Sequence, residues 1–297
     1  MLPLKWQIKS KLLTEIGEFM DYQGQFNDKV IFITGGARGI GKGVGDILSE
    51  RGASLAISDI DGEELKKIQT EYSSKGVEII TGIVDVTDTK SLDNFVSKVI
   101  SKFGQIDVCV PNAGAIGSSG FGTRKDYNDK DWDITWNVNV RGLVNTTDSV
   151  KEFMKEREEG KIVIVASQGG RKPRGVIDKG RGNVMSPYFV SKAAAIQFTH
   201  TLAMELGQYN INVNAVCPGR LWTSFWQNIA ENHQSLNPDL KNTDVYDIFI
   251  DQIKATMPLG KPQTPEDIGK AVAFLASSDA SQITGQALNI NGGGIFN

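Results

Sequence analysis

The stretch Thr34-Gly35-Gly36-Ala37-Arg38-Gly39-Ile40-Gly41 follows a run of apolar residues at 30–34 and leads into a segment with helical patterning. Glycines let a backbone turn tightly and approach a pyrophosphate, whose charge is met by the free amides and the dipole at a helix start. The Gly-x-x-x-Gly-x-Gly spacing, between a strand and a helix, favours a nucleotide-binding loop over an ordinary glycine-rich turn. We therefore predict a phosphate site in front of a helix that begins near Gly39 or Ile40.

Outward from this loop, short apolar runs alternate with stretches of helical length. Fully apolar strands joined by crossover helices indicate a parallel sheet covered on both faces, the doubly wound α/β architecture of the Rossmann fold. No internal repeat or Pro/Ser-rich linker divides the chain, so we expect 29–297 to form a single domain, with its site in the loops at the carboxyl ends of the strands. The predicted strands are 30–34, 54–58, 77–84, 106–110, 161–166, 211–216 and 286–290.

Composition excludes several classes of protein. Of 297 residues, 40% are hydrophobic and 23% charged, which excludes a disordered chain. Lys and Arg total 32 against 35 acidic residues, and this net charge of −3 argues against nucleic-acid binding. No apolar run approaches the ~18 residues of a membrane span. Cys109 and Cys217 lie in strand-like runs typical of buried thiols, and His200 and His233 are isolated, so we predict a cytoplasmic protein without a metal site.

Residues 1–28 form an extension before the predicted domain. Lysines interrupt its apolar residues, so it lacks the continuous core of a signal peptide. Its spacing is that of an amphipathic helix, and packing against the body or a neighbouring subunit is favoured over membrane-surface binding, because acidic residues would oppose anionic lipid. The apolar positions are Leu12, Leu13, Ile16, Phe19 and Met20, and the acids are Glu15, Glu18 and Asp21.

Asp59 ends the second predicted strand, at the distance past the glycines where an acid typically binds the ribose hydroxyls of a dinucleotide. A 2′-phosphate would meet a like charge there unless Arg38 neutralised it, so the sequence predicts NAD as cofactor, with NADP disfavoured. The alternative is a solvated turn acid that leads into Asp61-Gly62.

Tyr188 and Lys192 lie four residues apart at the start of a long helical run toward Gly207. That spacing places both side chains on one helix face, where the ammonium can lower the pKa of the phenol and prepare it for acid–base work. Ser167, at the end of an earlier strand, offers a hydroxyl that could hold a substrate oxygen. The alternatives are a turn residue for Ser167 and a surface aromatic for Tyr188.

With these residues, the chain from about Asp28 onward resembles the classical short-chain dehydrogenase/reductase family. Thr34 to Gly41 is similar to the family's cofactor loop, Asn112-Ala113-Gly114 to its element after the fourth strand, and Val138-Asn139 to its helix asparagine. The resemblance implies the catalytic residues Asn139, Ser167, Tyr188 and Lys192, with Asn139 ordering a proton-relay water, and a tetramer built through the long helices. It implies the cofactor-binding residues Thr34, Gly35, Arg38, Gly39, Ile40, Gly41, Asp59, Asp85, Val86, Asn112, Ala113, Gly114, Tyr188, Lys192, Pro218, Gly219 and Thr223.

Two segments depart from the family's usual pattern. The segment between Ser167 and Tyr188 is longer than usual and carries a local excess of positive charge. A solvated surface loop or subunit contact is favoured there over a site that steers an anionic substrate. A second long segment, about 221–258, resembles the family's mobile substrate lid, and its aromatic residues would shield the site or pack the helices. The charges of the first segment are Arg171, Lys172, Arg174, Lys179 and Arg181 against Asp178.

The resemblance implies an NAD(H)-dependent oxidoreductase that interconverts a secondary alcohol and a ketone. The lid and the ending Gly292 to Asn297 are similar to those of polyol, sugar-alcohol-phosphate and acetoin or butanediol dehydrogenases, so a polyol, a sugar alcohol with or without phosphate, or a small hydroxyketone is the expected substrate. Two alternatives stay open. One is a 3-oxoacyl or steroid-type carbonyl reductase with a more apolar pocket, and the other is a dinucleotide-binding regulator without turnover.

Overall fold

The computed structural model describes residues 22–121, 127–172 and 185–296. The helix expected within 1–21 and most of the basic segment, residues 173–184, therefore lie outside the described residues. Within the described ranges, no helix is both long enough and apolar enough to cross a membrane.

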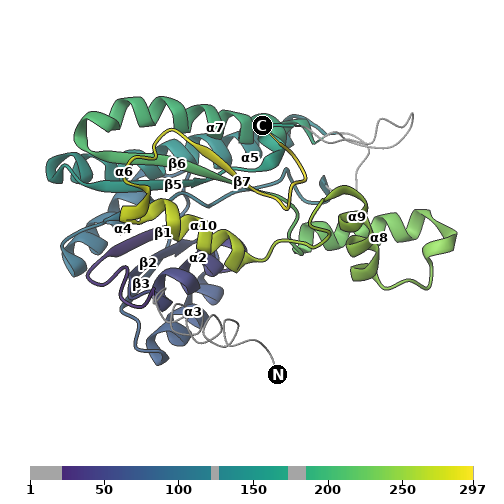
Figure 1. The fold of residues 1–297 in the computed structure, drawn as a ribbon, viewed down its shortest axis with the longest axis horizontal. Coiled ribbons are helices and arrows are strands. Elements are labelled where there is room, and N and C mark those ends of the chain that lie inside the picture. Colours follow the sequence, from purple (N-terminus) through teal and green to yellow (C-terminus); the bar gives the residue numbers. More distant parts are fainter. Residues whose placement is uncertain (1–21, 122–126, 173–184, 297) are drawn as a thin grey trace, which may run out of the picture.

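Seven parallel strands form one sheet with helices on both faces (Figure 1). In the order β3-β2-β1-β4-β5-β6-β7, the direction in which successive strands are added to the sheet switches between β1 and β4, which is where doubly wound folds bind their ligands. The predicted doubly wound sheet is confirmed; β3 and β4 each begin two residues later than expected. The strands are β1 Val30–Thr34, β2 Ser54–Asp59, β3 Ile79–Ile83, β4 Val108–Val110, β5 Gly160–Val165, β6 Ile211–Pro218 and β7 Ala287–Ile290.

The central strands consist mostly of apolar residues because both faces of the sheet are buried. In β1, Ile31 and Ile33 join the cluster on one face, and Val30 and Phe32 join the cluster on the other. Each of these side chains is at most 4% exposed. Burial of one such side chain contributes about 1.5–3 kcal/mol, so strand β1 anchors the glycine loop that follows it.

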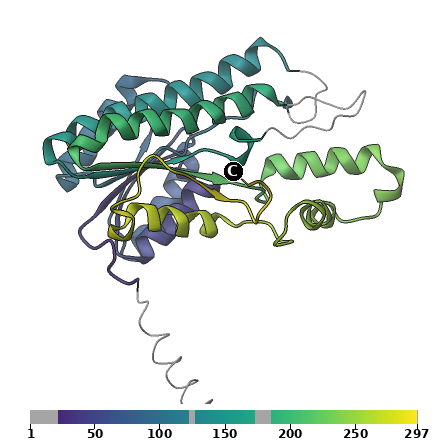
Figure 2. The ribbon, with the colours of Figure 1, turned by 45° about the horizontal axis from the view of Figure 1, so that its top comes forward.

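Two groups of helices cover the sheet (Figures 1 and 2). One face is covered by α2 Gly39–Glu50, α3 Gly62–Ser74 and α10 Pro265–Ala276, and the other by α4 Thr89–Phe103, α6 Gly142–Arg157 and α7 Ser186–Leu206. Several of these helices begin at a capping side chain: Asp61 accepts a hydrogen bond from the Glu64 amide, and Thr264 forms a capping box with Asp267. Short 3-10 turns span Gln168–Gly170, Gly207–Tyr209, Pro238–Leu240 and Ser278–Ala280.

Helix α5, Asp129–Trp136, runs into α6 through a π-turn at Asn137–Arg141. A π-turn inserts one residue into helical pairing and is often found at functional sites. The spacing of apolar residues does not reveal this π-turn, and the family resemblance implied only that Asn139 lies on a helix. The turn carries Asn139 toward the interior, where the residue is 3% exposed.

Helices α8, Ser224–Leu236, and α9, Val245–Thr256, project beyond the sheet at the end where β6 leaves it (Figures 1 and 2). They share a cluster of buried residues of their own, separate from the two clusters on the sheet. Their region therefore packs chiefly on itself. The cluster consists of Ala230, Ile248, Phe249, Ile253 and Met257.

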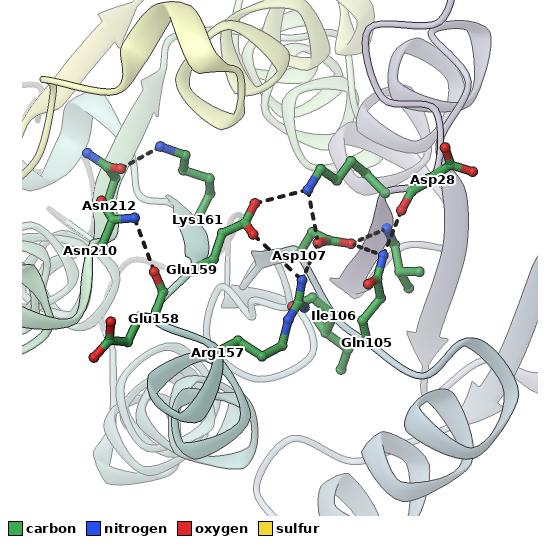
Figure 3. A network of polar contacts seen from close by, with 12 residues as sticks. Asp28, Gln105, Ile106, Asp107, Arg157, Glu158, Glu159, Lys161, Asn210 and Asn212 are labelled. Atoms are coloured by element: carbon green, nitrogen blue, oxygen red, sulfur yellow. Dashed lines mark hydrogen bonds and ion pairs between the residues drawn. The ribbon is translucent and has the colours of Figure 1, made fainter.

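A polar network joins strands at the opposite, amino edge of the sheet (Figure 3). Asp107, 4% exposed, accepts hydrogen bonds from the Val30 amide at 2.8 Å and from Gln105 Nε2 at 2.9 Å. It also pairs with Arg157 at 3.0 Å and Lys29 at 3.4 Å. A buried carboxylate requires such partners, so this network holds the starts of β1 and β4 in register.

Candidate active site

The glycine loop leaves an open space in front of α2. Arg38 occupies the N-cap position without a side-chain capping bond, and a Cβ added to Gly39, whose φ is +57°, would have no neighbour within 4 Å. The next glycine is tightly enclosed, since a Cβ on Gly41 would lie 2.6 Å from Asn112 Nδ2. The uncapped amides, the positive helix end and the absence of side chains fit a pyrophosphate.

Thr34 and Asn112 join the loops that follow β1 and β4. Thr34 Oγ1 accepts hydrogen bonds from the amides of Asn112 at 3.2 Å and Ala113 at 3.3 Å. Asn112 Nδ2 donates to the carbonyls of Thr34 at 3.0 Å and Gly35 at 2.8 Å. Both residues were predicted to bind the cofactor; the structure uses their polar side-chain atoms to fix the loops that would surround it.

Asp59 lies at the end of β2 beside the glycine loop and is 8% exposed. Its carboxylate accepts hydrogen bonds from the amides of Ala37 at 3.2 Å and Asp61 at 3.1 Å. Arg38 is exposed, and its guanidinium lies 3.5 Å from the Asp61 carboxylate. The acid predicted to bind ribose is therefore held in place by backbone amides, with accepting capacity left on both oxygens.

Asp85 and Val86 follow β3 and differ in exposure. Asp85 is exposed and accepts hydrogen bonds from the amide and the hydroxyl of Thr87. Val86 is buried, and its carbonyl accepts a hydrogen bond from Asn145 Nδ2 at 3.0 Å. Only the apolar Val86 side chain therefore contributes to the interior here.

The segment after β6 lies between the sheet and the α8–α9 region. Pro218 ends β6, and the Gly219 amide donates to the Ile290 carbonyl at 3.0 Å. Thr223 is exposed and is the N-cap residue of α8, without a side-chain capping bond. Its hydroxyl is thus not used by the helix that it precedes.

Tyr188 and Lys192 lie on the first turns of α7, as the sequence predicted. Lys192 Nζ is 5.9 Å from the centre of the Tyr188 ring and donates a hydrogen bond to the Val165 carbonyl at 2.9 Å. Lys192 is 7% exposed, and this burial lowers its pKa to about 8. The hydrogen bond to Val165 thereby holds the Lys192 ammonium beside the Tyr188 phenol.

Ser167 lies at the end of β5, close to Tyr188. Its hydroxyl accepts a hydrogen bond from the Gly169 amide at 3.0 Å. Burial raises the pKa of Tyr188, and a hydrogen bond with Ser167 opposes this shift only in part. The sequence predicted that Lys192 would lower this pKa, whereas in the structure the pKa is raised and burial of the phenol is the largest cause.

The side chain of Asn139 connects two segments behind Lys192. Its Nδ2 donates to the Ala115 carbonyl and to Ser191 Oγ, both at 2.9 Å, and its Oδ1 accepts from the Ala115 amide at 2.7 Å. Ser191 is fully buried and donates to the Tyr188 carbonyl at 2.8 Å. Ser191 was not among the predicted site residues; the signal available in the sequence was a hydroxyl one position before Lys192 on the same helix.

A small cavity of about 10 Å³ lies directly beside this group. That volume is at the lower bound for one water molecule. Because Asn139 uses its side-chain amide within the protein, the water predicted from the family resemblance would need other partners in the cavity wall. The lining residues include Thr34, Ala113, Asn139, Thr146, Val165 and Lys192.

Arg171 is the first residue of the basic segment, and it turns toward the sheet. Its guanidinium donates a hydrogen bond to the Ala287 carbonyl on β7 and lowers the pKa of Cys217, which burial raises. Cys109 and Cys217 are both buried and free, as predicted. Arg171 therefore serves the packing of β6 and β7, and the remaining positive charges after Lys172 lie outside the described residues.

Known proteins similar to this chain include two curated dehydrogenases or reductases. The chain is 32% identical over 266 residues to the (2S)-[(R)-hydroxy(phenyl)methyl]succinyl-CoA dehydrogenase subunit BbsD of Thauera aromatica, covering 90% of this chain and 96% of that protein. It is 32% identical over 269 residues to the (S)-acetoin-forming diacetyl reductase of Staphylococcus epidermidis, covering 90% and 99%.

Solved structures share the fold and about a third of the sequence. An NAD+-bound xylitol dehydrogenase gives a TM-score of 0.78 at 32% identity, covering 90% of this chain and 99% of that one. A variant of actinorhodin polyketide ketoreductase with NADPH gives 0.78 at 31%, covering 92% and 100%. Residues 35–294 match the family model described as enoyl-(acyl carrier protein) reductase. The chain therefore belongs to the short-chain dehydrogenase/reductase family.

Proposed function

We propose that this protein is an NAD(H)-dependent oxidoreductase that interconverts a secondary alcohol and a ketone. The observation that carries the proposal is the meeting of Ser167, Tyr188 and Lys192 at the edge of the sheet where the glycine loop after β1 also opens. A phenol, a hydroxyl and an ammonium are the groups that a carbonyl oxygen needs when it gains or loses a proton.

The loops fit a nicotinamide dinucleotide. The uncapped amides at the start of α2 would hold the pyrophosphate, and Asp59 would accept hydrogen bonds from ribose hydroxyls. When bound, the nicotinamide supplies or accepts the hydride. Lys192 would bind the other ribose, while the Thr34–Asn112 bonds keep the surrounding loops fixed.

In this proposal Tyr188 is the general acid and base that exchanges a proton with the substrate oxygen. Its raised pKa keeps the phenol protonated near neutral pH, so it can donate a proton to the oxygen of a ketone as that oxygen gains charge. In the opposite direction the phenol must first lose its proton, and the Lys192 ammonium favours that loss. Ser167 would hold the substrate oxygen beside the phenol.

The preference for NAD rests on Asp59. Its buried carboxylate would face the 2′-phosphate of NADP, and Arg38, the nearest cation predicted to offset it, pairs with Asp61 instead. The NAD+ of the xylitol dehydrogenase structure supports this choice, whereas the NADPH of the polyketide ketoreductase shows that the family uses both coenzymes.

For the substrate we propose a polyol, a sugar alcohol or a small hydroxyketone. The names of the xylitol dehydrogenase and the diacetyl reductase support this class. An acyl-thioester ketone is the second candidate, favoured by the acyl-carrier description of the matching family model and by the CoA-linked name of the Thauera aromatica relative.

We further propose a homotetramer in the cytoplasm. Trp136 on α5, Phe153 on α6 and Val190 on α7 are each about 40% exposed or more, and apolar side chains at such helix faces suit contact with a second copy. Free, buried Cys109 and Cys217 suit a reducing compartment. Analytical ultracentrifugation of the purified protein tests the assembly, for which a monomer would be the contrary result.

The experiment is an NADH and NADPH absorbance assay across both substrate classes. We expect diols or sugar alcohols to be oxidised with NAD+ and hydroxyketones to be reduced with NADH, and we expect weak turnover with NADP+ and NADPH. Faster turnover of a 3-oxoacyl thioester would favour the second candidate. Tight coenzyme binding without turnover of any ketone or alcohol would favour the regulator and would contradict the proposal.

A further inference from the structure

Helix α5 and the π-turn carry three polar side chains at intervals of four residues, all facing the chain segment 115–118. Residues four apart lie on one helix face, so these side chains form a row, here called the polar ladder. Each side chain of the ladder accepts a hydrogen bond from a backbone amide of the segment. The bonds join Ser118 N to Asp131 Oδ1 at 2.7 Å, Gly117 N to Thr135 Oγ1 at 3.0 Å and Ala115 N to Asn139 Oδ1 at 2.7 Å.

The ladder lies in the protein interior. Asp131 and Thr135 have no exposed surface, and Asn139 is 3% exposed. Buried polar side chains are unfavourable unless their hydrogen bonds are made, and here backbone amides of the segment make them. Asp131 also accepts a hydrogen bond from the Ser118 hydroxyl at 2.6 Å. The row therefore serves to fix the backbone of 115–118.

The segment itself has a backbone that few sequences could adopt. Gly117 has a φ of +62°, and a Cβ at this position would overlap the ring of Phe121, whose Cδ2 atom would lie 2.7 Å away. Phe121 is 2% exposed. The left-handed conformation and the enclosing ring leave room only for glycine. Together with the ladder, they hold 115–118 in one conformation.

The residues just before this segment lie beside Lys192. The segment continues from Asn112-Ala113-Gly114, and a Cβ placed on Gly114 would lie 3.7 Å from Lys192 Nζ. Asn139, the last residue of the polar ladder, also donates a hydrogen bond to Ser191 on the helix that carries Lys192. A shift of the segment would therefore move the wall of the site beside Lys192.

We infer that Asp131 and Thr135 are positioning residues, which hold 115–118 as a rigid wall of the substrate site. This inference rests on the proposed function, because it assigns the wall to the alcohol or ketone. Neither residue touches the reacting atoms; both act through the backbone of the segment. Small displacements in such walls reduce rates because the substrate loses its reactive orientation.

The main test compares Thr135→Val with Thr147→Val. Thr147 is an equally buried threonine on α6, and its hydroxyl donates only to a carbonyl of its own helix, that of Val144 at 2.9 Å. We expect Thr135→Val to raise KM for the substrate and lower kcat/KM about tenfold, with NADH affinity retained. Thr147→Val should stay within about twofold of wild type, and Thr135→Ser, which restores the hydroxyl, should recover most of the loss.

Hydrogen–deuterium exchange supplies a measurement that needs no turnover. In wild type, the amides of the segment should exchange slowly, and Thr135→Val should speed exchange in peptides that contain Gly117 while Thr147→Val does not. Unchanged exchange rates in Thr135→Val would contradict the claim that the polar ladder holds the segment in place. Faster exchange with unchanged kcat/KM would overturn its positioning role. If wild type turns over no substrate at all, the proposed function has failed, and exchange alone decides whether the ladder holds the segment.

Discussion

The side-chain amide of Asn139 donates a hydrogen bond to Ser191 Oγ over 2.9 Å, across 52 residues of sequence. Ser191 in turn contacts Tyr188, because its hydroxyl donates a hydrogen bond to the Tyr188 carbonyl. The first turn of α7 is thus tied to the π-turn behind it. The phenol of Tyr188 consequently sits on a backbone that is fixed from inside the protein.

Replacing Ser191 with alanine should lower kcat several-fold while leaving NADH affinity close to wild type. The change removes the link and leaves one Asn139 donor unpaired, at a cost of about 1–3 kcal/mol in the free energy of unfolding. Steady-state kinetics and urea unfolding measure both effects. Ser149→Ala is the matched control, since that hydroxyl donates only to the Thr146 carbonyl of its own helix. Equal kcat values in the two variants would contradict the account.

The pH dependence of catalysis should differ between the two directions. Burial lowers the pKa of Lys192 to about 8, so the side chain is cationic below that pH and neutral above it. Burial raises the pKa of Tyr188, so the phenol stays protonated through neutral pH. The kcat/KM of ketone reduction should therefore be steady at neutral pH and fall as Lys192 loses its charge, whereas alcohol oxidation should rise with pH.

Profiles of kcat/KM against pH in both directions test this expectation. Lys66→Met, which changes a surface lysine paired with Glu63, should leave both profiles unaltered. A reductive kcat/KM that stays constant well above pH 8 would show that the charge of Lys192 is not needed.

Asp59→Asn should shift coenzyme preference toward NADP. The amide keeps an oxygen for the neighbouring backbone amides but removes the charge that would repel a 2′-phosphate. We expect the ratio of kcat/KM for NADPH over NADH to rise by about tenfold or more, which corresponds to about 1.4 kcal/mol or more. Asp88→Asn, at the exposed start of α4, is the control. An unchanged ratio in Asp59→Asn would remove Asp59 from coenzyme selection.

Asp107→Ala should destabilise the protein without acting on the site directly. The buried carboxylate pairs with Lys29 and Arg157 at the amino edge of the sheet (Figure 3), whereas the glycine loop follows the carboxyl end of β1. Removing it leaves the Val30 amide without its acceptor, while Lys29 and Arg157 keep Glu159, so we expect a cost of about 1–3 kcal/mol. Urea unfolding should show this loss, and Glu63→Gln, which breaks an exposed pair, should show no measurable change. Similar unfolding curves for the two variants would contradict the stabilising role of Asp107.

The sequence predicted the sheet because its strands are apolar on both faces, a pattern that few other folds produce. It also predicted that Tyr188 and Lys192 share a helix face, because spacing alone decides that. It did not reveal the π-turn, since one inserted residue leaves the apolar pattern almost unchanged. Nor did it reveal Asp131 and Thr135, because polar residues on a helix usually face solvent and their backbone partners lie in a loop.

The direction of the pKa shift at Tyr188 could not be predicted from the sequence either. Spacing places an ammonium near the phenol, but only the packed structure shows that burial is the larger influence. Thr34 and Asn112 are a similar case, because their motifs mark the cofactor loops while the structure shows their side chains bonded to each other's backbone.

The central claim is that the Tyr188 phenol exchanges a proton with the substrate oxygen. Turnover and NADH binding, measured side by side in Tyr188→Phe and wild type, test it most directly. The phenylalanine keeps the ring and removes only the hydroxyl, so we predict a loss of nearly all turnover with the Kd for NADH unchanged. Near-normal turnover in Tyr188→Phe would contradict the claim.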